Sequence, residues 1–143
     1  MLSPHFSLAE FTTSQTAARM GVDNTPSPEI VANLQTTAAV LEQVREILKA
    51  PILISSGYRC EMLNRLVGGV WNSAHLCGRA ADFICPAYGS PLEVCQAIAK
   101  SGLKYDQLIY EMGAWTHLAW APEPRMVNLT IDLVCGTRNG LIG

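Results

Sequence analysis

Two histidines and an aspartate in this chain have the residue types and the spacing of a metal site. His75 and Asp82 lie in one short segment that begins at Ser73, and His117 follows shortly after Trp115. Two imidazoles and one carboxylate are the ligand set of a zinc site that keeps a fourth position open for water. The sequence contains only three histidines, so two of them in similar contexts indicate a zinc-dependent hydrolase.

A carboxylate and a cation near these residues complete the candidate machinery. Zinc lowers the pKa of a bound water to about 7, and a nearby carboxylate can take its proton and pass it to a leaving amine. Glu111 ends an apolar, strand-like run and is our candidate for that role. Arg59 follows a short predicted strand and is a candidate clamp for a carbonyl or carboxylate oxygen. We also expect Trp71, in a glycine-rich loop, and Ser73 to contact the substrate.

Several of these residues also have ordinary interpretations. His5 is best interpreted as an ordinary surface or core histidine, and Glu111 alone could be the solvent-exposed end of a strand. Asp82 alone would be a buried carboxylate that needs a partner, and a metal is one such partner. Cys77, two residues from His75, could be a fourth ligand or a nucleophile. The other ligands form a zinc site without it, and proximity to a histidine does not by itself indicate an activated thiol.

The composition indicates one compact globular domain over residues 1–143. Hydrophobic residues make up 49% of the chain and charged residues 15%, which is enough for a substantial core. A formal net charge of −2 without a cationic run argues against nucleic acid as a partner, and no stretch is long and apolar enough to span a membrane. Five cysteines without a CxxC pair indicate free thiols in a reducing compartment. The N-terminus lacks the features of a secretory signal, so we expect synthesis in the cytoplasm.

The N-terminal half is predicted to be mainly helical. Ser7, Ser14 and Ser27 are candidate N-caps, and Glu10 gives the first of them the spacing of a capping box. Apolar residues then recur at helical spacing to about residue 49, which predicts one long core-forming helix. Further helices are expected over residues 60–66 and 91–100.

The C-terminal half is predicted to supply most of the strands. They are expected over residues 52–56, 80–84, 107–111, 116–120 and 127–133, with residues 70–78 as a loop. Helices first and strands later indicate the α+β class, and we expect a mainly antiparallel sheet with helices packed on one face. Asp82 and His117 would then lie on strands and His75 in the loop before one, with Gly78 allowing the tight turn between them.

The joint set of motifs resembles a known family over nearly the whole chain. The motif residues are Phe6–Phe11, Ala17-Ala18-Arg19, Asn24-Thr25-Pro26, Ser56-Gly57-Tyr58-Arg59, Asn64, Gly68-Gly69, Asn72-Ser73-Ala74-His75, Gly78-Arg79-Ala80-Ala81-Asp82 and Trp115-Thr116-His117. They resemble the zinc D-Ala-D-Ala carboxypeptidase family of peptidoglycan peptidases, in its short phage and prophage endolysin-like branch. The resemblance implies the fold shared with the hedgehog signalling domain.

The resemblance also implies roles for particular residues. Zinc would be bound by His75, Asp82 and His117, and Glu111 would be the catalytic carboxylate. Arg59 would stabilise the substrate carbonyl or grip a carboxylate of the peptide.

From the ligand set and the resemblance we expect a zinc metallopeptidase that hydrolyses an amide bond in the peptide stems or cross-links of bacterial peptidoglycan. It would act as a carboxypeptidase or an endopeptidase in phage or prophage lysis or in wall degradation, after release from the cell or as a virion component. The alternative is a non-catalytic, zinc-stabilised binding module or virion structural module. We expect a monomer whose partner is the peptidoglycan peptide, with neither nucleic acid nor membrane as a partner.

Overall fold

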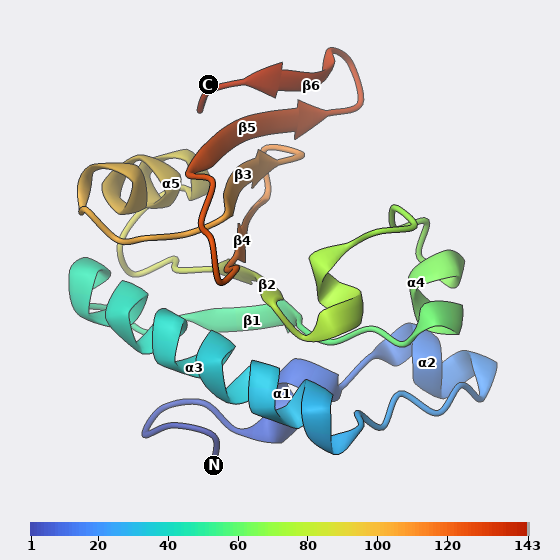
Figure 1. Ribbon diagram of the computed structural model, residues 1–143. Coiled ribbons are helices and arrows are strands. Elements are labelled where there is room, and N and C mark those ends of the chain that lie inside the picture. Colours follow the sequence, from blue (N-terminus) through green and yellow to red (C-terminus); the bar gives the residue numbers. More distant parts are fainter. Residues whose placement is uncertain (143) are drawn as a thin grey trace.

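The computed structural model describes residues 1–142 and shows an α+β protein (Figure 1). This confirms the predicted class. The helices are α1 (Leu8–Thr12), α2 (Gln15–Met20), α3 (Pro28–Leu48), α4 (Glu61–Leu66) and α5 (Pro91–Lys100), with a short 3-10 helix η1 (Ala74–Cys77). The strands are β1 (Leu53–Ser56), β2 (Ala80–Ile84), β3 (Gln107–Glu111), β4 (Trp115–Ala119), β5 (Val127–Asp132) and β6 (Gly136–Asn139). None of the helices within these residues is long and apolar enough to cross a membrane.

Serine caps begin the N-terminal helices, as predicted. The Ser7 side chain accepts a hydrogen bond from the Glu10 backbone N–H, and the Glu10 carboxylate accepts one from the Ser7 backbone N–H, so α1 starts with a complete capping box. The Ser14 and Ser27 side chains cap α2 and α3 by accepting hydrogen bonds from the backbone N–H groups of Ala17 and Ile30. These caps satisfy backbone donors that the first helical turn leaves without partners.

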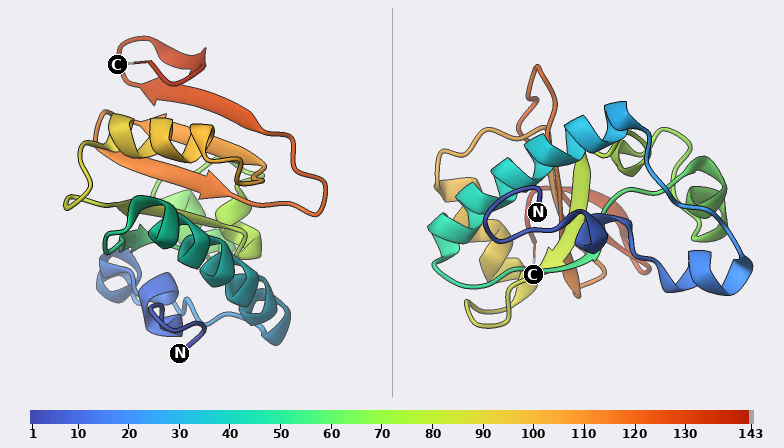
Figure 2. Two further views of the ribbon diagram at one scale, coloured as in Figure 1. Left: turned by 90° about the vertical axis from the view of Figure 1, so that its left-hand side faces the viewer. Right: turned by 90° about the horizontal axis from the view of Figure 1, so that it is seen from below.

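The helices α3 and α5 cover one face of the sheet (Figure 2). The buried residues of α3 are Leu34, Thr37, Ala38, Leu41, Val44 and Leu48, and those of α5 are Val94, Cys95 and Ile98. They form one hydrophobic core with strand residues such as Phe83, Leu108 and Leu118. Removal of this apolar surface from water is the main force that fixes the helices on the sheet.

The six-stranded sheet has the order β1-β2-β4-β3-β5-β6 and is mixed. Neighbouring strands are antiparallel except β3 and β5, which are parallel. The prediction of a mainly antiparallel sheet did not include this parallel pair. It arises because the segment 120–126 carries the chain from β4 past β3, so that β5 pairs with the far edge of β3.

The strand register decides which residues lie on the open face of the sheet. Asp82 of β2 pairs with His117 of β4, and Glu111 of β3 pairs with Trp115. Directly paired residues point to the same side of a sheet, and side chains alternate along each strand. These four side chains therefore share one face, opposite to the face that carries Leu118 in the core.

Two further features differ from the sequence expectations. Residues 70–78 are not entirely a loop, because the Ser73 side chain caps η1 and Gly78 ends it in the left-handed conformation with φ 72°. The short strand β6 was not predicted, because its polar, exposed residues carry no apolar alternation. Most other predicted boundaries agree with the structure to within one residue.

Candidate metal centre

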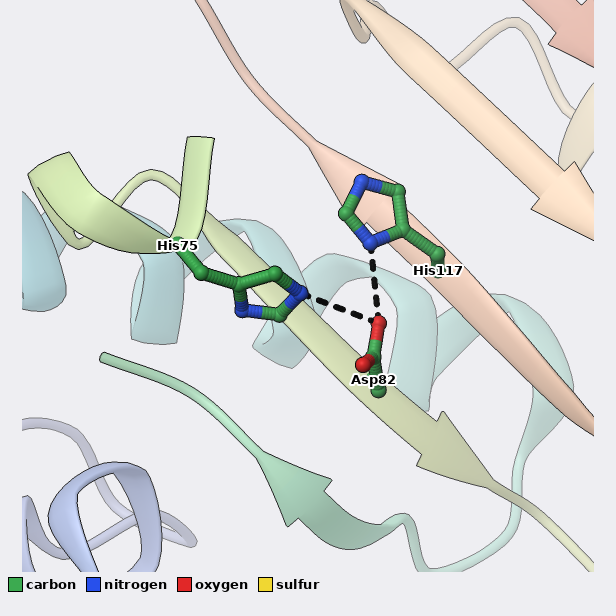
Figure 3. A group of neighbouring side chains, drawn as sticks. All are labelled: His75, Asp82 and His117. Atoms are coloured by element: carbon green, nitrogen blue, oxygen red, sulfur yellow. Dashed lines mark hydrogen bonds and ion pairs between the residues drawn. The ribbon is translucent and has the colours of Figure 1, made fainter. Parts of the chain in front are cut away.

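The structure brings His75, Asp82 and His117 together, as the sequence predicted (Figure 3). Nε2 of His75 lies 3.2 Å from Oδ1 of Asp82, and Nδ1 of His117 lies 2.8 Å from the same oxygen. One ligand atom from each residue falls within 4.8 Å of the others. Within residues 1–142, no other histidine, cysteine, aspartate or glutamate joins this group. The arrangement therefore offers three protein donors and leaves room for a further ligand.

Each of the three residues comes from a different, well-fixed element. His75 lies in η1, whose first turn is held by a hydrogen bond from the His75 backbone N–H to the Ser73 hydroxyl. Asp82 and His117 lie on β2 and β4, where they are directly paired. Both histidines are buried, with 1% and 6% of their surface exposed. Ligands on packed elements of this kind hold their geometry better than ligands on exposed loops.

The hydrogen bonds of His75 show that the group fits a cation. Nδ1 of His75 lies 2.6 Å from the Gly57 carbonyl oxygen, which can only accept, so the hydrogen is on Nδ1. Nε2 of the neutral ring then presents a lone pair to the Asp82 carboxylate, which also only accepts. Burial lowers the pKa of His75 despite the nearby Asp82 charge, which disfavours a second proton on the ring. A divalent metal ion satisfies both lone pairs, and the carbonyl bond on the far nitrogen is the usual support of a metal-binding histidine.

The pKa values of the two carboxylates are shifted in opposite directions. Burial opposes ionisation of Asp82, but the two histidines beside it outweigh burial and hold its pKa below its usual range. Burial raises the pKa of Glu111, and the negative charge of Asp82 raises it further. Oε1 of Glu111 lies 3.9 Å from Nδ1 of His117. Two neighbouring carboxylates with separated pKa values can take different roles, one as a ligand and the other in proton transfer.

Arg59 supplies a half-buried positive charge beside this centre. Burial lowers its pKa, while the charges of Asp82 and Glu111 act in the opposite direction, and a guanidinium remains protonated in proteins. Its Nε is buried without a hydrogen-bond partner among the described residues. The backbone N–H of Arg59 donates to the His75 carbonyl oxygen at 3.1 Å, which ties the cation to the same turn as a proposed ligand.

A cleft of about 870 Å³ reaches the centre from the side of α1 and α2. Its walls are formed by α1 and the α1–α2 segment, by β1 and the residues that follow it, and by Leu63 and Val67. Arg59, Asp82 and Trp115 also line it. The cleft therefore connects solvent with the carboxylate of the metal centre and with the neighbouring cation.

The remaining candidate residues do not line this cleft. Trp71 is 87% exposed in the turn before η1, and Ser73 uses its hydroxyl as the cap of η1. Neither residue lines the cleft described above. Cys77 is an exposed free thiol outside the ligand group, and His5 forms an exposed ion pair with Glu42.

Two residues contribute to the site although the sequence analysis assigned them no role. Gly57 supplies the carbonyl that fixes the His75 ring, and Trp115 forms part of the cleft wall. Both stand inside motif segments of the sequence, but no spacing rule assigns a function to a backbone carbonyl. Their roles became visible only from the contacts.

A comparison with protein-family models identifies residues 4–119 as Peptidase M15. The match covers most of the chain, so the protein belongs to the peptidase M15 family. Peptidases of this family depend on a metal ion, typically zinc, and the group of His75, Asp82 and His117 is a potential site for it. No curated protein matches the chain.

Proposed function

We propose that this member of the peptidase M15 family hydrolyses an amide bond in the peptide stems or cross-links of bacterial peptidoglycan. The observation that carries the proposal is the convergence of two imidazoles and one carboxylate beside Glu111 and Arg59. A purely structural metal site is usually closed by four protein ligands. Here a proton-transfer group and a cation lie beside three ligands, which favours catalysis.

His75, Asp82 and His117 would hold the zinc ion. When bound, zinc acts as a Lewis acid and makes a water nucleophilic at neutral pH. The His75 ring is oriented by the Gly57 carbonyl, and the Asp82 carboxylate is held ionised by the two histidines. The Gly57 carbonyl thus leaves Nε2 of His75 free to bind a metal, and one ligand atom from each of the three residues lies within 4.8 Å of the others.

Glu111 is proposed as the general base and then the general acid. Its carboxylate accepts a proton from the attacking water and returns that proton to the amine that leaves when the amide bond breaks. Burial raises its pKa, which brings the group closer to the range in which a carboxylate can both accept and release a proton. Arg59 is proposed to bind the carbonyl oxygen of the scissile amide as negative charge develops there.

The finer parts of the proposal come from the sequence motifs. They favour the hedgehog/DD-peptidase fold, a single zinc peptidase domain over residues 1–143, and an endolysin-like role in phage or prophage lysis. In that role the protein would act on the cell wall as a monomer after release or as a virion component, without a nucleic-acid or membrane partner. Ser73 and Trp71 remain proposed substrate contacts.

The first test is the variant Glu111→Gln. Release of peptide fragments from purified peptidoglycan should fall by about 10²–10⁴-fold, the usual contribution of a general base, while the variant retains the zinc stoichiometry of the wild type. Glu46→Gln is the matched control, because Glu46 is an exposed carboxylate on α3 whose only ion pair is with Lys49 among the described residues. Full activity of Glu111→Gln would remove Glu111 from the mechanism. Mass spectrometry of the fragments identifies the bond that is cut.

Removal of the metal distinguishes between two hypotheses, a zinc-dependent enzyme and a structural zinc module. A chelator should abolish hydrolysis, and added zinc should restore it, with the fold retained throughout. A chain that unfolds when the metal is removed, and that never releases fragments, would instead be a zinc-stabilised module.

A further inference from the structure

Five large apolar side chains are exposed along α4 and the turn that follows it. They are Met62 (58% exposed), Leu66 (44%), Val67 (44%), Val70 (65%) and Trp71 (87%). We call this group the apolar platform. Single exposed apolar residues are ordinary, but a cluster of this kind on a monomer usually marks a binding surface. The metal centre does not use these side chains.

Local structure holds the platform in one place. Met62 and Leu66 are four residues apart on α4, so they lie on the same helix face, while Leu63 points into the core. The buried Asn64 side chain donates to the Val70 carbonyl oxygen at 2.9 Å, and the Gly69 N–H donates to the Asn64 carbonyl oxygen at 2.8 Å. These bonds hold the turn against α4 at Asn64 and so fix the backbone that carries Val70.

The platform continues into the cleft that reaches the metal centre. Val67 belongs to both surfaces, and Leu63, on the same helix, also lines the cleft. In Figures 1 and 2, α4 lies beside α2 at one end of the molecule, away from α5 and from β5–β6. The platform is therefore adjacent to the cleft at Val67.

The chemistry of the platform favours a saccharide as its occupant. An exposed indole ring offers a flat apolar surface with a negative face, on which the C–H face of a pyranose ring can stack. Glu61 and Arg65, an exposed ion pair at 3.2 Å on α4, and the exposed Asn72 provide polar groups for sugar hydroxyls. An anionic membrane would instead require a cluster of cations, and α4 has six residues with Arg65 as its one cation.

We propose that the apolar platform binds the glycan strand of peptidoglycan and so presents its peptide stems to the cleft. This inference rests on the proposed function, since it takes the substrate to be a glycan that carries peptides.

The test measures binding of the zinc-loaded protein to soluble glycan strands from which all peptides have been removed. Trp71→Ala should weaken binding about tenfold, the loss expected when one large apolar side chain no longer leaves water on binding. Val70→Ser should weaken it to a smaller extent. The matched control is the double variant Leu133→Ser and Val134→Ser, because these residues are 91% and 92% exposed at the β5–β6 turn. It should bind like the wild type, and all variants should melt within a few degrees of it.

Three results would overturn the inference. The first is equal binding by the platform variants and the wild type. The second is binding of the wild type to vesicles of anionic lipid with none to glycan strands, and the third is a platform variant that turns a dimer into a monomer. Because the glycan strands contain no amide cross-link, binding is independent of hydrolysis. A protein that binds the glycan strands but releases no peptide from peptidoglycan would contradict the proposed function alone. A protein that cleaves stem peptides but does not bind the glycan strands would contradict this inference alone.

Discussion

Replacement of Gly57 by alanine tests whether the contact between α1 and β1 positions the His75 ligand. A Cβ atom at Gly57 would lie 2.6 Å from the carbonyl oxygen of Phe11 and 2.7 Å from its Cα. Both are backbone atoms, which cannot rotate away as a side chain would. Since van der Waals contact between such atoms requires about 3.5 Å, α1 and the end of β1 must separate by roughly 1 Å. The carbonyl of Gly57, which accepts from Nδ1 of His75, moves with them.

We expect Gly57→Ala to affect both the stability of the fold and the affinity for zinc. Overpacking of a close contact costs about 1–3 kcal/mol of stability, which corresponds to a fall in melting temperature of about 3–12 °C for a chain of this length. Loss of a hydrogen bond that orients a metal ligand typically reduces metal affinity by about 10–100-fold. Gly57→Ala should therefore lower both the melting temperature and the zinc affinity.

Thermal unfolding and competition with a chromophoric chelator measure these two quantities on the same samples. Gly89→Ala is the matched control, because the three atoms nearest to a Cβ there belong to the end of the Glu93 side chain, at 3.0 Å or more, and not to backbone. It should change the melting temperature slightly and the zinc affinity not at all. If Gly57→Ala and Gly89→Ala bind zinc equally tightly, the Gly57 carbonyl does not position the ligand and the reasoning is wrong.

Three further measurements follow from charge and burial. Burial raises the pKa of Glu111 and the Arg59 charge lowers it, so Arg59→Met should move the acid limb of the kcat/KM profile to higher pH; an unmoved limb would mean that the two groups do not interact. Hydrogen bonds from Arg125 lower the pKa of Asp106, so this carboxylate stabilises the fold above its unfolded pKa of about 3.9 and loses that contribution as the pH falls through the lower folded value. The melting temperature of Asp106→Asn should accordingly lie below that of the wild type at about pH 6 and approach it toward about pH 2, and a constant difference would contradict the assignment. Burial raises the pKa of the Cys95 thiol to about 11, so peptide mapping after iodoacetamide treatment should find it labelled later than the exposed cysteines, Cys77 and Cys135.

The elements with strong local signals could be predicted from the sequence. The helix over 91–100 and the strands over 80–84 and 107–111 have the predicted bounds. In the helix, Ser90 caps the first turn and Pro91 occupies its first position, a combination that favours only one start. Local chemistry of this kind acts within a few residues, so it can be read without knowledge of the fold.

The parts that escaped prediction depend on contacts between distant segments. The parallel pairing of β5 with β3 is set by the path of the chain after β4, and β6 forms only because β5 offers it an edge. At the site, the convergence of His75 with its partners followed from residue types. The roles of the Gly57 carbonyl and of Trp115 in the cleft wall could not be predicted, because residue types do not reveal a backbone acceptor or a pocket.

The register of β2 and β4 explains why the centre and the core can share one sheet. Asp82 lies between Ala81 and Phe83, both of which are fully buried on the helix-covered face. A slip of one residue in β2 would exchange these positions and place the carboxylate in the hydrophobic core, where an unpaired charge is strongly destabilising. Burial of Phe83 against α3 and α5 therefore also fixes the direction of Asp82. The hydrophobic burial that stabilises the fold therefore also directs the Asp82 carboxylate, a candidate metal ligand, toward His117.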